Sequence, residues 1–199
     1  MQFQMRIKSV GNTSLVYEQI LRDASNGNVL WQGNFGDAFV KYESKRTKSK
    51  SAVIPASFKE VCMKYCNDSP STRILPPDVP EHGCFVYRVD IMYSDTDLNR
   101  HSTMSSYVRF CLDCADVASR AGHYRLFLHN PAQLPVKTHQ IVYKGESFEG
   151  DTLEVHTWEV EKKPDNVLYF AIMRQGSLIV HCSFEFHEEP IAPTVSSRL

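Results

Sequence analysis

One long segment of helical periodicity, residues 102–122, constrains the fold more than any other feature of this 199-residue chain. Apolar residues recur along it at steps of three and four, as on one face of an α-helix. They are Tyr107, Phe110, Cys111, Cys114, Val117, Ala118 and Ala121. Gly122 follows the last of them and is a typical helix terminator. Such a helix must bury its apolar stripe against another element.

Strand patterns surround this helix. Residues 85–93 alternate between apolar and polar and are separated from the helix by a short polar loop. After the helix, four strands are predicted at 136–143, 152–160, 167–174 and 178–187. We therefore expect a complete α+β domain at residues 85–188, in which an antiparallel sheet, with its last four strands in a meander, wraps around a long central helix.

The N-terminal part predicts a shorter copy of the same unit. Three strands and a short helix are expected within residues 1–66, with an Asn-Gly turn between the second and third strands. Residues 20–22, Ile-Leu-Arg before that turn, are similar to Ile-Met-Arg at 172–174, before the last hairpin turn. We expect residues 67–84, which hold four prolines, to be a linker and residues 189–199 to be a loose tail.

Three polar side chains lie between the first strand of the complete domain and its helix. Asp97, Asn99 and His101 fall within five residues, at the expected helix N-terminus. Unpaired backbone N–H groups and the positive end of the helix dipole favour negative charge there. A helix cap is an alternative reading of Asp97 or Asn99, and a structural histidine is an alternative for His101. Together, the three groups favour a functional site.

Residues 93–101, Tyr-Ser-Asp-Thr-Asp-Leu-Asn-Arg-His, followed by Tyr107, resemble the motif D-x-N-x-H-V-N-N-x-x-Y of the hotdog-fold thioesterases. The likeness is closest to the acyl-ACP thioesterase and 4-hydroxybenzoyl-CoA thioesterase branch. Ser-Thr-Met at 102–104 replaces Val-Asn-Asn, and Arg100 stands where Gly or Gln is common. The resemblance implies a hotdog fold with a partial second hotdog unit at the N-terminus. It also implies an enzyme that hydrolyses acyl-CoA or acyl-ACP thioesters.

The residue types at 97–101 suit thioester hydrolysis. Asp97 is predicted to be a general base or a nucleophile, Asn99 to hold the water or the carbonyl, and His101 to orient the carboxylate or pass a proton. The N–H groups after His101 are expected to stabilise the oxyanion. A further catalytic candidate, from the resemblance, is Glu146. Candidate substrate-binding residues are Ser102, Thr103 and Tyr107.

Several other classes of function are disfavoured. The net charge is −1, with 22 basic and 23 acidic residues, which gives no support for a nucleic-acid partner. The absence of G-x-S-x-G disfavours a serine hydrolase, and the six cysteines form no paired zinc pattern. Cys111 and Cys114 are expected in the core. We expect no metal, no cofactor and no membrane partner.

Two alternative functions remain. A hotdog hydratase or dehydratase is disfavoured because its motif, D-x-N-P-x-H, has a proline after the asparagine and places histidine one residue later. A non-catalytic acyl-CoA-binding protein is the other.

The C-terminal Ser197-Arg198-Leu199 is similar to the peroxisomal signal S-K-L, so we expect a peroxisomal or else a cytoplasmic location, and CoA as the carrier. We also expect that the chain either self-associates through the hotdog sheets or is a shortened form of a longer protein.

Overall fold

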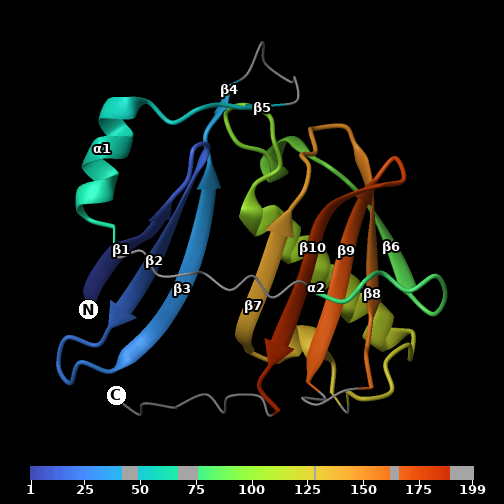
Figure 1. Ribbon diagram of the computed structural model, residues 1–199. Coiled ribbons are helices and arrows are strands. Elements are labelled where there is room, and N and C mark those ends of the chain that lie inside the picture. Colours follow the sequence, from blue (N-terminus) through green and yellow to red (C-terminus); the bar gives the residue numbers. More distant parts are fainter. Residues whose placement is uncertain (42–48, 67–75, 128, 162–165, 189–199) are drawn as a thin grey trace. The chain divides into compact units, whose positions relative to one another are not determined.

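The computed structural model describes residues 1–41, 49–66, 76–127, 129–161 and 166–188 (Figure 1). The chain divides into two compact units, Met1–Arg73 and Ile74–Leu199. The predicted tail, 189–199, and the first half of the predicted linker, 67–75, lie outside the described residues.

The first unit contains an antiparallel sheet with the order β1-β2-β3. Its strands are β1 (Gln2–Val10), β2 (Ser14–Arg22) and β3 (Val29–Ala38). A short pair, β4 (Val40–Lys41) and β5 (Lys50–Ser51), and helix α1 (Ala56–Lys64) follow. The turn between β2 and β3 forms because the Asp23 carboxylate accepts the backbone N–H of Ser25 at 2.8 Å, while Gly27 takes a left-handed φ of 75°.

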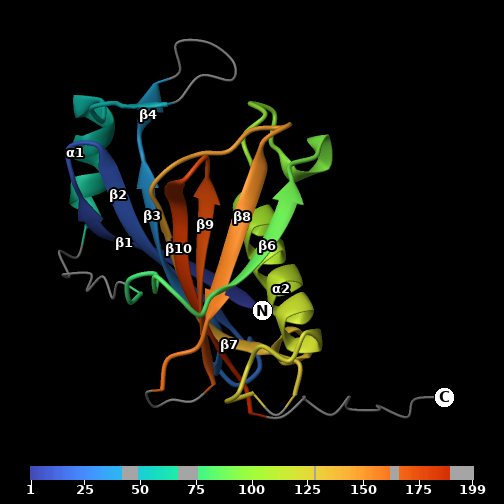
Figure 2. The same cartoon turned by 90° about the vertical axis from the view of Figure 1, so that its right-hand side faces the viewer.

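The second unit is a five-stranded antiparallel sheet with one long helix against one face (Figures 1 and 2). The strands are β6 (Phe85–Asp90), β7 (Val136–Tyr143), β8 (Thr152–Trp158), β9 (Val167–Arg174) and β10 (Ser177–Phe186). The helix is α2 (Met104–Arg120), and the short 3-10 turns are η1 (Tyr93–Asp95) and η2 (Pro131–Gln133). The predicted sheet around a central helix is confirmed.

The strand order differs from the predicted meander. It is β6-β8-β9-β10-β7, so β8, β9 and β10 form a meander, but β7 pairs with β10 at the far edge. The place beside β8 is taken by β6. The segment between β7 and β8 must therefore cross the end of the sheet, past two intervening strands. We call residues 144–151 the crossing segment; it brings Glu146 to the start of α2.

The segment before α2 also differs from the prediction. The strand predicted to reach Tyr93 ends at Asp90. It ends early because the carboxylate of Asp95 accepts the backbone N–H of Met92 at 2.9 Å, which closes the η1 turn. Asp95 is 5% exposed and is ion-paired with Arg109 of α2. Asp95 therefore ties the turn to the helix, a role that the sequence pattern did not indicate.

Helix α2 is capped by Thr103, not by Asp97 or Asn99. Thr103 has an extended backbone, and its hydroxyl accepts the N–H of Ser106 at 3.2 Å. The helix therefore begins at Met104, two residues later than the periodic pattern suggests.

The predicted helix terminator is confirmed. Gly122 has a φ of 68°, and its N–H donates to the carbonyl of Ser119 at 2.9 Å. The N–H of His123 donates to the carbonyl of Ala118 at 3.0 Å. These two bonds form a Schellman motif, which needs a left-handed residue at the position of Gly122.

The core of the second unit lies between α2 and the inner face of the sheet. Its largest fully buried side chains include Phe110, Phe170, Phe184 and Phe186. Cys111 and Cys114 are also buried, as predicted, and burial raises the pKa of the Cys114 thiol to about 12. Both thiols therefore stay neutral and act as small apolar residues. Among the described residues, no helix is long and apolar enough to cross a membrane.

Candidate active site

The loop before α2 is a tight turn organised by Asp97. Its Oδ1 atom accepts the backbone N–H of Asn99 at 2.8 Å and that of His101 at 3.1 Å. The Asp97 N–H in turn donates to the carbonyl of His101 at 2.8 Å. Asp97 and Asn99 are exposed. One oxygen of the Asp97 carboxylate is thus committed to holding His101 in place.

Arg100 occupies the left-handed part of this turn, with a φ of 66°. A side chain in this conformation costs roughly 1–2 kcal/mol, and a glycine would adopt it readily. Arg100 stays there because its guanidinium lies 2.5 Å from Glu149 Oε2 and stacks over the ring of Tyr93, 4.5 Å from its centre. Arg100 therefore ties the loop to the crossing segment.

His101 and Glu146 lie side by side. The Nδ1 atom of His101 is 3.6 Å from Oε1 of Glu146, and His101 is only 7% exposed. The imidazole contacts the ring of Phe148 edge-on, with centroids 4.8 Å apart. Arg174 anchors the crossing segment by donating to the Glu146 carbonyl at 3.4 Å. A largely buried imidazole beside a carboxylate is an arrangement that can take up and return a proton.

Three hydroxyl groups near this pair form a cluster, in which Tyr107 and Ser147 are buried and Ser102 is half-buried. The Tyr107 hydroxyl lies 2.9 Å from Ser147 Oγ, which donates to Ser102 Oγ at 2.7 Å. Ser147 is fully buried and Tyr107 is 4% exposed; burial raises the pKa of Tyr107, so its hydroxyl stays neutral. The hydroxyl of Tyr107, a residue predicted to bind substrate, is hydrogen-bonded to Ser147. No sequence feature distinguished Ser147 from an ordinary turn residue.

The first two backbone N–H groups after His101, which were expected to form an oxyanion site, already donate hydrogen bonds within the protein. The N–H of Ser102 donates to the carbonyl of Ser147 at 2.9 Å, and that of Thr103 donates to the carbonyl of Asp95 at 3.0 Å. The prediction is therefore wrong for these two groups, because the crossing segment and the η1 turn accept their hydrogens. Residues 104–105, both exposed, carry the next N–H groups at the positive end of α2.

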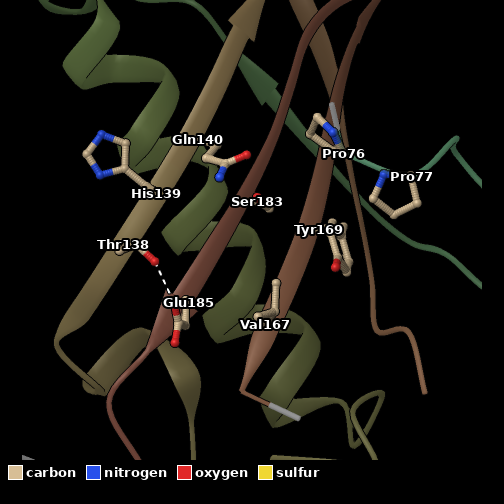
Figure 3. Close-up of a pocket in the computed structure, with 9 residues that line it drawn as sticks. All are labelled: Pro76, Pro77, Thr138, His139, Gln140, Val167, Tyr169, Ser183 and Glu185. Carbon is tan, nitrogen blue, oxygen red and sulfur yellow. Dashed lines mark hydrogen bonds between the residues drawn. The ribbon is translucent and has the colours of Figure 1, made fainter. Parts of the chain in front are cut away.

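A cleft lies on the face of the second unit's sheet that points away from α2, and its side chains differ from those around His101 and Glu146 (Figure 3). Its lining includes Thr138, Tyr169, Ser183 and Glu185. The Thr138 hydroxyl donates to Glu185 at 2.6 Å, and hydrogen bonds from Lys137 and Thr138 hold the pKa of Glu185 below its usual value. This carboxylate therefore stays ionised, and the ammonium group of Lys137, 2.7 Å away, balances its charge. The pair formed by His101 and Glu146 is the stronger candidate for catalysis.

The geometry predicts different results for two replacements of Asp97. Asparagine keeps an oxygen that can accept the two backbone N–H groups, so Asp97→Asn should retain the activity of the protein within about tenfold. Asp97→Ala removes the acceptor and should lower kcat by about 100-fold, because misplacing a reacting group by about 1 Å costs that much. Steady-state kinetics, with thermal melts as the folding control, would check both. Equal losses of about 100-fold or more would make Asp97 itself the base.

The sequence matches no protein-family model and no curated protein. The structure is similar to the 12:0-ACP thioesterase from Umbellularia californica, with a TM-score of 0.70 and 12% identity over 93% of this chain and 66% of that one. It is also similar to an acyl-ACP thioesterase from Bacteroides thetaiotaomicron, with a TM-score of 0.60 and 16% identity over 93% of this chain and 68% of that one. The chain spans about two thirds of the length of these proteins. The protein thus has the hotdog fold of these thioesterases.

Proposed function

We propose that this protein is a thioesterase that hydrolyses acyl-CoA or acyl-ACP thioesters to a free acid and a thiol. The pair formed by His101 and Glu146, 3.6 Å apart at the start of the central helix, carries this proposal. The fold supports it, because two similar structures are acyl-ACP thioesterases.

In the proposed reaction, His101 and Glu146 act as one acid–base unit. A water molecule attacks the thioester carbonyl carbon and gives a proton to the imidazole, while the carboxylate stabilises the imidazolium. The C–S bond of the tetrahedral intermediate then breaks. The imidazolium returns the proton to the departing thiolate, so acid and thiol leave and the pair is restored. The edge-on contact with Phe148 limits rotation of the imidazole during these steps.

The neighbouring groups would bind the carbonyl oxygen. Asn99, two residues before His101 in the same turn, is exposed, and its amide can donate to an oxygen that gains negative charge. Residues 104–105 are exposed, and their N–H groups belong to the positive end of α2, which favours negative charge. Asp97 holds the turn that presents Asn99 and His101.

The test is an assay with a panel of acyl-CoA and acyl-ACP substrates of several chain lengths, together with an aromatic acyl-CoA. Release of free thiol, with an equal amount of acid, is the expected result for at least one substrate. Tight binding of acyl-CoA without turnover would favour the non-catalytic alternative. Addition of water to an enoyl thioester would favour the hydratase.

Two further properties belong to this proposal. Ser197-Arg198-Leu199, which lies outside the described residues, supports a peroxisomal location with CoA as the carrier, and the cytoplasm is the alternative. Phe3 and Met5 on β1 are each 61% exposed, which supports self-association through the sheets.

A further inference from the structure

The two residues of the proposed acid–base unit lie on two separate loop segments, so no helix or strand contains both of them. His101 lies in the loop before α2, and Glu146 lies in the crossing segment between β7 and β8. The distance between the imidazole and the carboxylate therefore depends on contacts between these two segments. The residue that follows each of them makes such contacts.

Ser102 follows His101, and Ser147 follows Glu146. The Ser102 N–H donates to the Ser147 carbonyl at 2.9 Å, and the Ser147 hydroxyl donates to the Ser102 hydroxyl at 2.7 Å. His101 and Phe148 extend this pairing as an antiparallel bridge. The two segments are therefore held in one register at the position of the pair.

Tyr107, in the first turns of α2, completes the connection. Its hydroxyl oxygen accepts the Ser147 N–H at 3.1 Å, and the Tyr107 hydroxyl lies 2.9 Å from Ser147 Oγ. Since the Ser147 hydroxyl donates to Ser102, Tyr107 donates to Ser147. The carbonyl, the N–H and the hydroxyl of Ser147 thus all have partners on α2 or on the loop before it. Water does not replace these partners, because Ser147 is fully buried.

We propose that the cluster of Ser102, Tyr107 and Ser147 positions Glu146 against His101, an inference that rests on the proposed function. These three are positioning residues: they act through the pair and do not contact the reacting atoms. Without the Tyr107 hydroxyl, the buried N–H of Ser147 has no acceptor, and the crossing segment shifts to find one. A shift of about 1 Å in a reacting group lowers a rate by about 100-fold.

The experiment compares Tyr107→Phe with Tyr124→Phe. Tyr124 lies beyond the other end of α2, and its hydroxyl bonds to Thr157 Oγ1 at 2.9 Å, so the matched control removes a similar hydroxyl pair far from His101. We expect Tyr107→Phe to lower kcat by about 10- to 100-fold with KM within about twofold. Tyr124→Phe should leave both constants unchanged. If Tyr107→Phe also leaves kcat unchanged, the proposal is overturned.

A double-mutant cycle with Glu146→Gln separates positioning from a general loss of stability. If the cluster acts through Glu146, then Tyr107→Phe has no further effect on kcat in the Glu146→Gln protein. Independent, additive losses would overturn the proposal.

A readout that needs no turnover keeps this test distinct from the test of the proposed function. In NMR spectra, Tyr107→Phe and Glu146→Gln should move the ring resonances of His101 in the same direction, and Tyr124→Phe should not move them. If wild type hydrolyses no thioester, the proposed function fails, and the spectra still decide whether the cluster positions Glu146. Unmoved resonances in Tyr107→Phe would overturn the positioning role.

Discussion

Replacing Glu146 by glutamine should lower kcat for thioester hydrolysis by about 100- to 10,000-fold, the range typical for loss of a general acid–base group. Glutamine has nearly the same shape as glutamate but lacks the negative charge that stabilises an imidazolium 3.6 Å away. His101→Gln should cause a loss in the same range. The double variant should be no slower than either single variant, because the two residues act as one unit. Steady-state kinetics on purified proteins with matched thermal melts would measure these effects.

Glu149→Gln is the matched control for this prediction. Glu149 lies in the same crossing segment, and its carboxylate pairs with Arg100. The control should lose less than about tenfold in kcat, since the acid–base unit remains intact. Equal losses in Glu146→Gln and Glu149→Gln would mean that general disturbance of the crossing segment explains the effect.

Truncating Phe184 to alanine should lower the free energy of unfolding by about 3–5 kcal/mol. Phe184 is fully buried on β10, and its ring lies 5.3 Å from that of Phe170 and 6.4 Å from that of Phe186. Alanine would leave a cavity among side chains that α2 and the sheet hold in place. Urea denaturation followed by circular dichroism would measure the loss.

Val86→Ala provides the comparison on the same sheet. Val86 lies on β6 and is 44% exposed, so its truncation should cost less than about 1 kcal/mol. Similar losses in both variants would show that the core is not centred between α2 and the inner face of the sheet.

Local patterns predicted the elements of the second unit better than their arrangement. The bounds of β7 and β9 match the predicted strands at 136–143 and 167–174. The position of β7 at the far edge was missed, because alternation identifies which face of a strand is apolar but not which strand lies beside it. The connection between β7 and β8 looked like an ordinary turn, although it crosses the end of the sheet.

The same distinction applies to the candidate site. Asp97, Asn99 and His101 are close in sequence, so a local motif could identify them together. Glu146 was found only through a family resemblance, because the crossing that brings it to His101 is a property of the whole sheet. Ser147 was not found, since a buried serine in a polar turn has no local pattern that separates it from an exposed one.

The most direct test of the account is hydrolysis of a substrate thioester in ¹⁸O-enriched water, with mass spectrometry of the products. Activation of water by His101 and Glu146 predicts one ¹⁸O atom in each acid released. It also predicts no label in the enzyme peptide that contains Glu146 after a single turnover, because water attacks the carbonyl directly. Label in that peptide would make Glu146 a nucleophile that forms an anhydride. Intact thioester after prolonged incubation with the folded protein would contradict the proposed thioesterase activity.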